Sequence, residues 1–210
     1  MITEFLINIA INIITAMGYP GIFLVMAAES FMVPVPPEIT VVFSGYLASA
    51  GKLNIIPVIV WSVAGALTGS TFAYWVGYHF KKTIVKKLIE RHGHFLFFTQ
   101  YELEETKELF KKHGPWIIFV SRFIPGIRSV VSLPLGILHI PFRQFITYTA
   151  VGTLISTSML TYLGLILNDN WTQIRVYLHK FDILIIFFLI MILGVYIYKR
   201  HKKQKGDQKT

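Results

Sequence analysis

The sequence predicts an all-α integral membrane protein with an inverted repeat, in which two opposed re-entrant helical hairpins lie beside transmembrane helices. Three observations predict this fold class: long apolar runs, prolines inside two of them, and charges of opposite sign beside those prolines. Of the 210 residues, 54% are hydrophobic and 15% are charged, whereas a soluble domain carries about 25% charged residues. No Gly/Ser-rich or Pro-rich linker divides the chain, so we expect one membrane domain over residues 1–198.

The positive charge is concentrated at the C-terminal end of the chain. The formal net charge is +9, and residues 199–210 hold six Lys/Arg against one Asp. A basic segment after a transmembrane helix stays in the cytoplasm and interacts with anionic head groups. We therefore predict a basic cytoplasmic tail and no nucleic-acid partner. The absence of cysteine excludes disulfides and thiolate chemistry, and the N-terminus lacks the pattern of a signal peptide.

Four apolar runs are candidates for crossing the membrane. Residues 55–80 and 140–167 are long enough to span it, and residues 181–198 form a shorter last span before the tail. Residues 2–17 fall short of the usual length of about 20 residues. This first run either crosses the membrane or lies in its interface.

Residues 81–113 differ from the rest in carrying eight Lys/Arg and five Glu among periodic apolar positions. Such a pattern is typical of amphipathic helices on a membrane surface. With the tail inside, the spans place this basic segment in the cytoplasm as well, as the positive-inside rule requires. Its histidines, His92, His94 and His113, lack metal-site spacing. We expect neither a metal nor a cofactor.

The first predicted hairpin covers residues 18–51, an apolar stretch that contains Glu29 and Glu38. Between these carboxyls lie three prolines, each of which removes a backbone donor and disfavours helix in the preceding residue. Two half-helices around an extended break are therefore expected. Broken backbone at membrane depth must be buried in protein or line a cavity, which favours a re-entrant hairpin. The helix-breaking residues are Pro34, Pro36 and Pro37.

The second predicted hairpin covers residues 114–138 and holds Arg122 and Arg128, with a break at Pro125 and Gly126. An arginine at bilayer depth costs about 2.5–3.5 kcal/mol even on the lenient insertion scale. A membrane protein keeps such a residue where it has a partner or a task. The two arginines are therefore candidate functional residues.

The two halves of the chain repeat one order of residues: a glycine, a charge, a proline, a second charge and a glycine. Because the spans place 18–51 on the outer face and 114–138 on the cytoplasmic face, the repeat is inverted, as in many secondary transporters. The members are Gly21, Glu29, Pro34, Glu38 and Gly45, and then Gly114, Arg122, Pro125, Arg128 and Gly136. Each long span then has glycines twelve residues apart, Gly65 and Gly77 in the first and Gly152 and Gly164 in the second.

The four charges indicate a site for an anion and a proton. The planar forks of Arg122 and Arg128 suit phosphate oxygens, and backbone amides around Gly126 would add donors at the positive end of a half-helix. Burial favours the neutral form of a carboxyl and a nearby arginine favours the charged form, so Glu29 and Glu38 are candidate proton carriers. Two alternatives are ion pairs that only lock the bundle, and arginines that snorkel to the interface.

At these residues the chain resembles the DedA family, also called the SNARE-associated or VTT-domain family. The resemblance covers about residues 18–167 and rests on Glu29 with the following PVPPE, on FVSRFIPGIR at 119–128, and on Pro-x-Gly at 134–136. It implies opposed re-entrant hairpins in the bacterial cytoplasmic membrane and lipid translocation. The essential acidic and arginine pairs of the family would fall on Glu29 with Glu38 and on Arg122 with Arg128.

The resemblance implies a flippase for undecaprenyl phosphate, the carrier of cell-wall precursors, and we expect it to be linked to protons. A phosphate monoester suits two arginines better than a zwitterion. The alternatives are a flippase or scramblase for phosphatidylethanolamine or another phospholipid, and a proton-coupled exporter of small cations. A lipid phosphatase is disfavoured because no His-x-x-x-Asp follows Ser121-Arg122. The sequence leaves open the direction of transport, the coupling ion and the oligomeric state, a homo-oligomer included.

Overall fold

Two long apolar helices, α4 (Ile55–His79) and α10 (Phe142–Leu167), form the scaffold of the computed structural model. Both are long and apolar enough to cross a membrane by length and composition, and they coincide with the apolar runs at 55–80 and 140–167 that the sequence predicts to be spans. Pro57 lies in the first turn of α4, and Pro141 directly precedes α10. A proline is tolerated at these positions because the first turn of a helix has no intrahelical partners for its N–H groups.

The structure describes residues 2–31, 37–79, 107, 110, 113–124 and 127–168. Over these residues it is helical and contains no strand, as the sequence predicts. Several predictions fall outside the described residues. They concern nearly all of the surface segment 81–113, the last span 181–198, the tail 199–210, and the helix-breaking residues Pro34, Pro36, Pro125 and Gly126.

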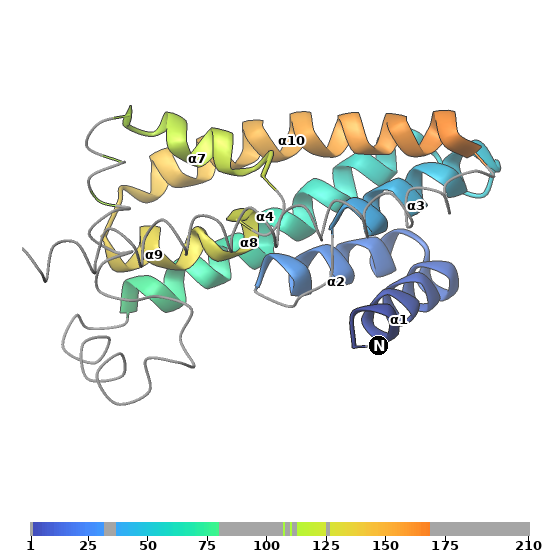
Figure 1. Ribbon diagram of the computed structural model, residues 1–210, viewed down its shortest axis with the longest axis horizontal. Helices are drawn as coiled ribbons and strands as arrows, with labels where there is room; N and C mark the ends of the chain where they lie inside the picture. Colours follow the sequence, from blue (N-terminus) through green and yellow to red (C-terminus); the bar gives the residue numbers. More distant parts are fainter. Residues whose placement is uncertain are drawn as a thin grey trace, which may run out of the picture. The chain divides into compact units, whose positions relative to one another are not determined.

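Of the N-terminal helices, α2 is the one that packs along α4. α1 (Ile2–Met17) ends at Gly18, whose φ of 63° turns the chain into α2 (Tyr19–Ser30), and α3 (Pro37–Ser49) follows. α1 packs on α2, and α2 packs along α4. The second contact depends on Gly65 and Gly69, because a Cβ at either position would collide with a backbone carbonyl of α2. α2 and α3 thus form a pair of helices that start and finish at the same end of α4 (Figure 1).

Three short helices make up the corresponding part of the second half: α7 (Trp116–Ser121), α8 (Ile127–Val130) and α9 (Ser132–Ile137). α7 packs on α10, and α9 packs on α4. In Figure 1 these helices, in green and yellow, begin and finish at the end of the bundle opposite to α2 and α3. A buried cluster of Tyr74, Ile118, Leu135 and Phe145 joins them to the two long helices.

The last helix of each group packs on the long helix of the other half, α3 on α10 and α9 on α4. Both contacts place a glycine from each partner against a backbone carbonyl of the other helix, so the backbones touch without intervening side chains. A Cβ on Gly45 or Gly164 would collide with the carbonyl of Thr161 or Val42, and one on Gly136 or Gly77 with that of Tyr74 or Leu133. In each of the four helices, the glycine lies three positions after the residue whose carbonyl oxygen faces the glycine of the partner helix.

Candidate functional site

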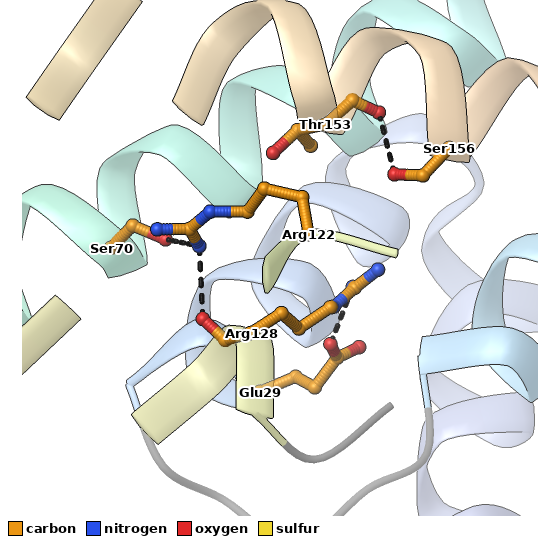
Figure 2. Close-up of polar contacts among 6 residues, drawn as sticks. All are labelled: Glu29, Ser70, Arg122, Arg128, Thr153 and Ser156. Atoms are coloured by element: carbon orange, nitrogen blue, oxygen red, sulfur yellow. Dashed lines mark hydrogen bonds and ion pairs between the residues drawn. The ribbon is translucent and has the colours of Figure 1, made fainter. Parts of the chain in front are cut away.

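A buried ion pair connects the two groups of short helices. Glu29 lies in the last turn of α2 and Arg128 lies in α8, and the distance from Arg128 Nη2 to Glu29 Oε1 is 2.6 Å (Figure 2). Only 1% of Glu29 and 6% of Arg128 is exposed. Both charges are therefore withdrawn from solvent, and each reduces the cost of burying the other.

Arg122, directly after α7, has a different set of partners. Its Nη1 donates to Ser70 Oγ at 3.2 Å and to the carbonyl oxygen of Arg128 at 2.9 Å (Figure 2). Its Nη2 donates to Ser132 Oγ and to Thr149 Oγ1, both at 3.2 Å. In the described part of the chain, no carboxylate lies within ion-pair distance of this guanidinium. The side chain is buried like that of Arg128, but all four of its partners are neutral.

An aromatic wall lies on one side of the Arg122 guanidinium. Arg122 Cζ is 5.9 Å from the ring centroid of Phe145, and Phe145 stacks on Tyr74 with their centroids 4.7 Å apart. Tyr74 is fixed in turn by a hydrogen bond of 2.6 Å from its hydroxyl to the carbonyl oxygen of Ile140. The ring face of Phe145 attracts the cation without neutralising it, so the site keeps its positive charge.

Two buried polar atoms at the site have no hydrogen-bond partner in the described part of the chain, Arg122 Nε and Glu29 Oε2. Buried polar groups are nearly always paired, so each exception indicates strain or a function. Nε offers one more hydrogen bond to an acceptor, and Oε2 can accept one. Glu38, in the first turn of α3, is partly buried.

The structure brings together Glu29, Arg122 and Arg128, three of the residues that the sequence singled out. Both arginines are buried within the protein, which argues against the alternative in which they snorkel to the interface. The hydroxyls that hold Arg122 were missed. Only Thr149 has a signal in the sequence pattern, because it belongs to a buried polar stripe on an apolar helix: α10 carries Thr149, Thr153, Ser156, Thr157 and Thr161 at steps of about one helical turn.

The family model described as VTT domain matches residues 35–166 of this chain. The match covers α3 and α10 and both arginines. No solved structure matches the chain.

Three curated relatives match over most of the chain. "Uncharacterized membrane protein YkoX" of Bacillus subtilis is 30% identical over 195 residues, which is 92% of this chain and 85% of the relative. "Alkaline phosphatase-like protein" of Lactococcus lactis is 30% identical over 198 residues, 93% of this chain and 92% of the relative. "Undecaprenyl phosphate transporter A" of Bacillus subtilis is 26% identical over 191 residues, 91% of this chain and 92% of the relative.

Proposed function

This chain belongs to the VTT-domain family, also called the DedA family, and from this premise we propose that it transports undecaprenyl phosphate across the bacterial cytoplasmic membrane. One relative bears the name of an undecaprenyl phosphate transporter, at 26% identity. The observation that carries the proposal is the state of Arg122, a buried cation surrounded by neutral partners. A phosphate group would supply the missing negative charge.

The physical argument concerns the cost of burial. A charge taken out of water is expensive unless a partner of opposite charge compensates it. Arg128 has Glu29 for that purpose, and Arg122 has no carboxylate among the described residues. A phosphate monoester brings up to two negative charges and no positive one, whereas the head group of phosphatidylethanolamine brings its own ammonium. The monoester is therefore the better partner for this site.

We further propose that Glu29 links transport to protons. A phosphate on Arg122 would also attract Arg128, because the backbone of Arg128 already contacts the Arg122 guanidinium. Once Arg128 leaves Glu29, the buried carboxyl lacks a compensating charge and takes up a proton. Glu38, in the first turn of α3, is the second candidate proton carrier. Phosphate and proton would then share one charge network.

The reciprocal glycine contacts support the proposal of an inverted repeat with two re-entrant hairpins. Gly45 of α3 packs against α10 and Gly136 of α9 packs against α4, each next to a residue three positions before a glycine of the long helix. In this topology α2 and α3 enter from the outer face, and α7 to α9 enter from the cytoplasm, where the C-terminus also lies. Such pairs of broken helices meet near the midplane, where transporters bind their substrates.

The topology can be tested with single cysteines, because the chain has none of its own. Lys52 and His113 are exposed residues at the ends of the two helix groups. In intact cells, a membrane-impermeant maleimide should label Lys52→Cys. It should label His113→Cys only after permeabilisation. Labelling of both variants in intact cells would contradict the inverted topology.

The transport proposal is tested with purified protein in vesicles. Undecaprenyl phosphate and phosphatidylethanolamine would each carry a reporter, and the fraction of each lipid reaching the opposite leaflet would be measured. We expect movement of undecaprenyl phosphate, strongly reduced in Arg122→Lys because a point charge cannot reproduce the planar fork. Equal movement of phosphatidylethanolamine would indicate a phospholipid scramblase, and movement of small cations alone would indicate an exporter.

A lipid phosphatase is the second candidate, because one relative at 30% identity bears the name alkaline phosphatase-like protein. Among the described residues, the polar partners of the two arginines are hydroxyl, carboxyl and carbonyl oxygens, and no imidazole is among them to activate a hydroxyl as a nucleophile. The same vesicles distinguish the candidates. Release of inorganic phosphate from undecaprenyl phosphate would show that the protein is a phosphatase and would contradict the transporter proposal.

A further inference from the structure

We propose that Ser70, Ser132 and Thr149 form a hydroxyl cradle that donates hydrogen bonds to the phosphate group and selects a monoester over a diester. This inference rests on the proposed function, because it assigns further residues to the same site. Each hydroxyl comes from a different helix: α4, α9 and α10 respectively. All three are buried and accept a hydrogen bond from an Nη atom of Arg122 at 3.2 Å.

The cradle differs from the other buried hydroxyls in what its O–H groups do. Ser44, Ser121, Ser156 and Thr161 each donate to a carbonyl of their own helix or segment. Figure 2 shows this difference: Ser156 contacts Thr153 within α10, whereas Ser70 faces Arg122. Thr40, Ser62 and Thr157 have no hydrogen-bond partner in the described residues. Among these residues, only the three cradle hydroxyls accept a hydrogen bond from a guanidinium.

Each cradle hydroxyl still has a proton to donate. A serine or threonine hydroxyl is one donor and two acceptors, and these three are used only as acceptors in the part of the chain that the structure describes. A buried donor without an acceptor is unfavourable. An anion beside Arg122 would provide that acceptor for several hydroxyls at once.

The hydrogen bonds within the cradle are suited to replacement. A distance of 3.2 Å is at the long end of the usual range of about 2.7–3.2 Å for N–H···O bonds. A charged phosphate oxygen is a stronger acceptor than a hydroxyl and makes shorter bonds with a guanidinium. When phosphate takes the Nη donors, the three hydroxyls can rotate and donate to it.

The number of donors favours one class of phosphate. A monoester has three terminal oxygens, while the phosphodiester of a phospholipid has two. Three convergent hydroxyls together with a guanidinium fork can pair all the terminal oxygens of a monoester. With a diester, the three hydroxyls and the guanidinium fork would have to share two terminal oxygens, so the hydrogen bonds would be fewer or weaker, which is the usual basis of discrimination by polar groups.

Thr149→Val tests the cradle, because valine keeps the shape of threonine and removes only the hydroxyl. The matched control is Thr161→Val, on the same helix, where the buried hydroxyl bonds to its own helix. The probes are farnesyl monophosphate, farnesyl methyl phosphodiester and farnesol, titrated into purified protein in detergent. We expect Thr149→Val to weaken binding of the monoester about tenfold or more, the effect of one hydrogen bond to a charged group.

The expected pattern has four further parts. Thr149→Ser should restore most of the lost affinity, Ser132→Ala should reproduce the loss, and Thr161→Val should bind all probes like the unmodified protein. In Thr149→Val and Ser132→Ala, affinity for the diester should fall much less than affinity for the monoester. Unchanged monoester binding in both Thr149→Val and Ser132→Ala, or an equal loss in Thr161→Val, would overturn the cradle alone. If the unmodified protein bound farnesyl monophosphate no better than farnesol, the proposed function would fail together with the cradle.

Discussion

Arg122 and Arg128 lie six residues apart on the same group of short helices and are both buried, yet they have opposite surroundings. Arg128 contacts a carboxylate at 2.6 Å, and Arg122 contacts three hydroxyls and a carbonyl. The first arrangement is neutral overall, and the second keeps a positive charge. Burial alone therefore does not distinguish the two arginines, and the charge of their partners does.

The largest effect on stability is expected for Arg128→Gln. Removing one partner of a buried ion pair leaves the other uncompensated and costs about 3–5 kcal/mol. The free energy of unfolding in detergent should fall by this amount at neutral pH. It should fall less at acidic pH, where Glu29 can take up a proton and lose its charge. A loss that does not depend on pH would show that Glu29 is not left unpaired.

Glu29→Gln should make the surroundings of Arg128 resemble those of Arg122. The amide oxygen of glutamine still accepts a hydrogen bond but carries no charge. We therefore expect a loss smaller than the loss of about 3–5 kcal/mol in Arg128→Gln, because only the charge compensation is removed. Transport of undecaprenyl phosphate should also lose its dependence on pH. An unchanged pH profile in the vesicle assay would rule out Glu29 as the proton carrier.

A smaller effect is expected for Phe145→Leu, which removes the ring beneath Arg122 and its stacking on Tyr74. An aromatic pair contributes about 0.5–1.5 kcal/mol and a cation–π contact about 0.5–2 kcal/mol, so the free energy of unfolding of the variant should fall by about 1–3 kcal/mol. Phe5→Leu, at an exposed position of α1, is the control and should change stability little. If both variants lost the same stability, the aromatic wall would have no specific role.

Much of the fold could be predicted from the sequence, because apolar length and proline position are local signals. The spans at 55–80 and 140–167 match α4 and α10 within two residues at either end. The charge pattern likewise singled out Glu29, Arg122 and Arg128, since an arginine in an apolar run is costly wherever it lies.

The partners of each charge could not be predicted in this way. Ion pairing depends on which helices face one another, and the sequence allowed Glu29 or Glu38 to pair with either arginine. The contribution of Ser70, Ser132 and Thr149 depends on three helices converging on one guanidinium. A hydroxyl in an apolar helix usually bonds to its own backbone, as Thr161 does, so its presence alone does not indicate a site.

The central claim is that Arg122 is a buried charge kept for a phosphate ligand, and Arg122→Gln tests it most directly. The measurement is the thermal unfolding midpoint in detergent, with and without farnesyl monophosphate. Removing a cation that has no counter-charge should leave the unliganded variant at least as stable as the unmodified protein. Farnesyl monophosphate should raise the midpoint of the unmodified protein and not that of Arg122→Gln. A large loss of stability in the unliganded variant, or a ligand-induced rise equal to that of the unmodified protein, would contradict the claim.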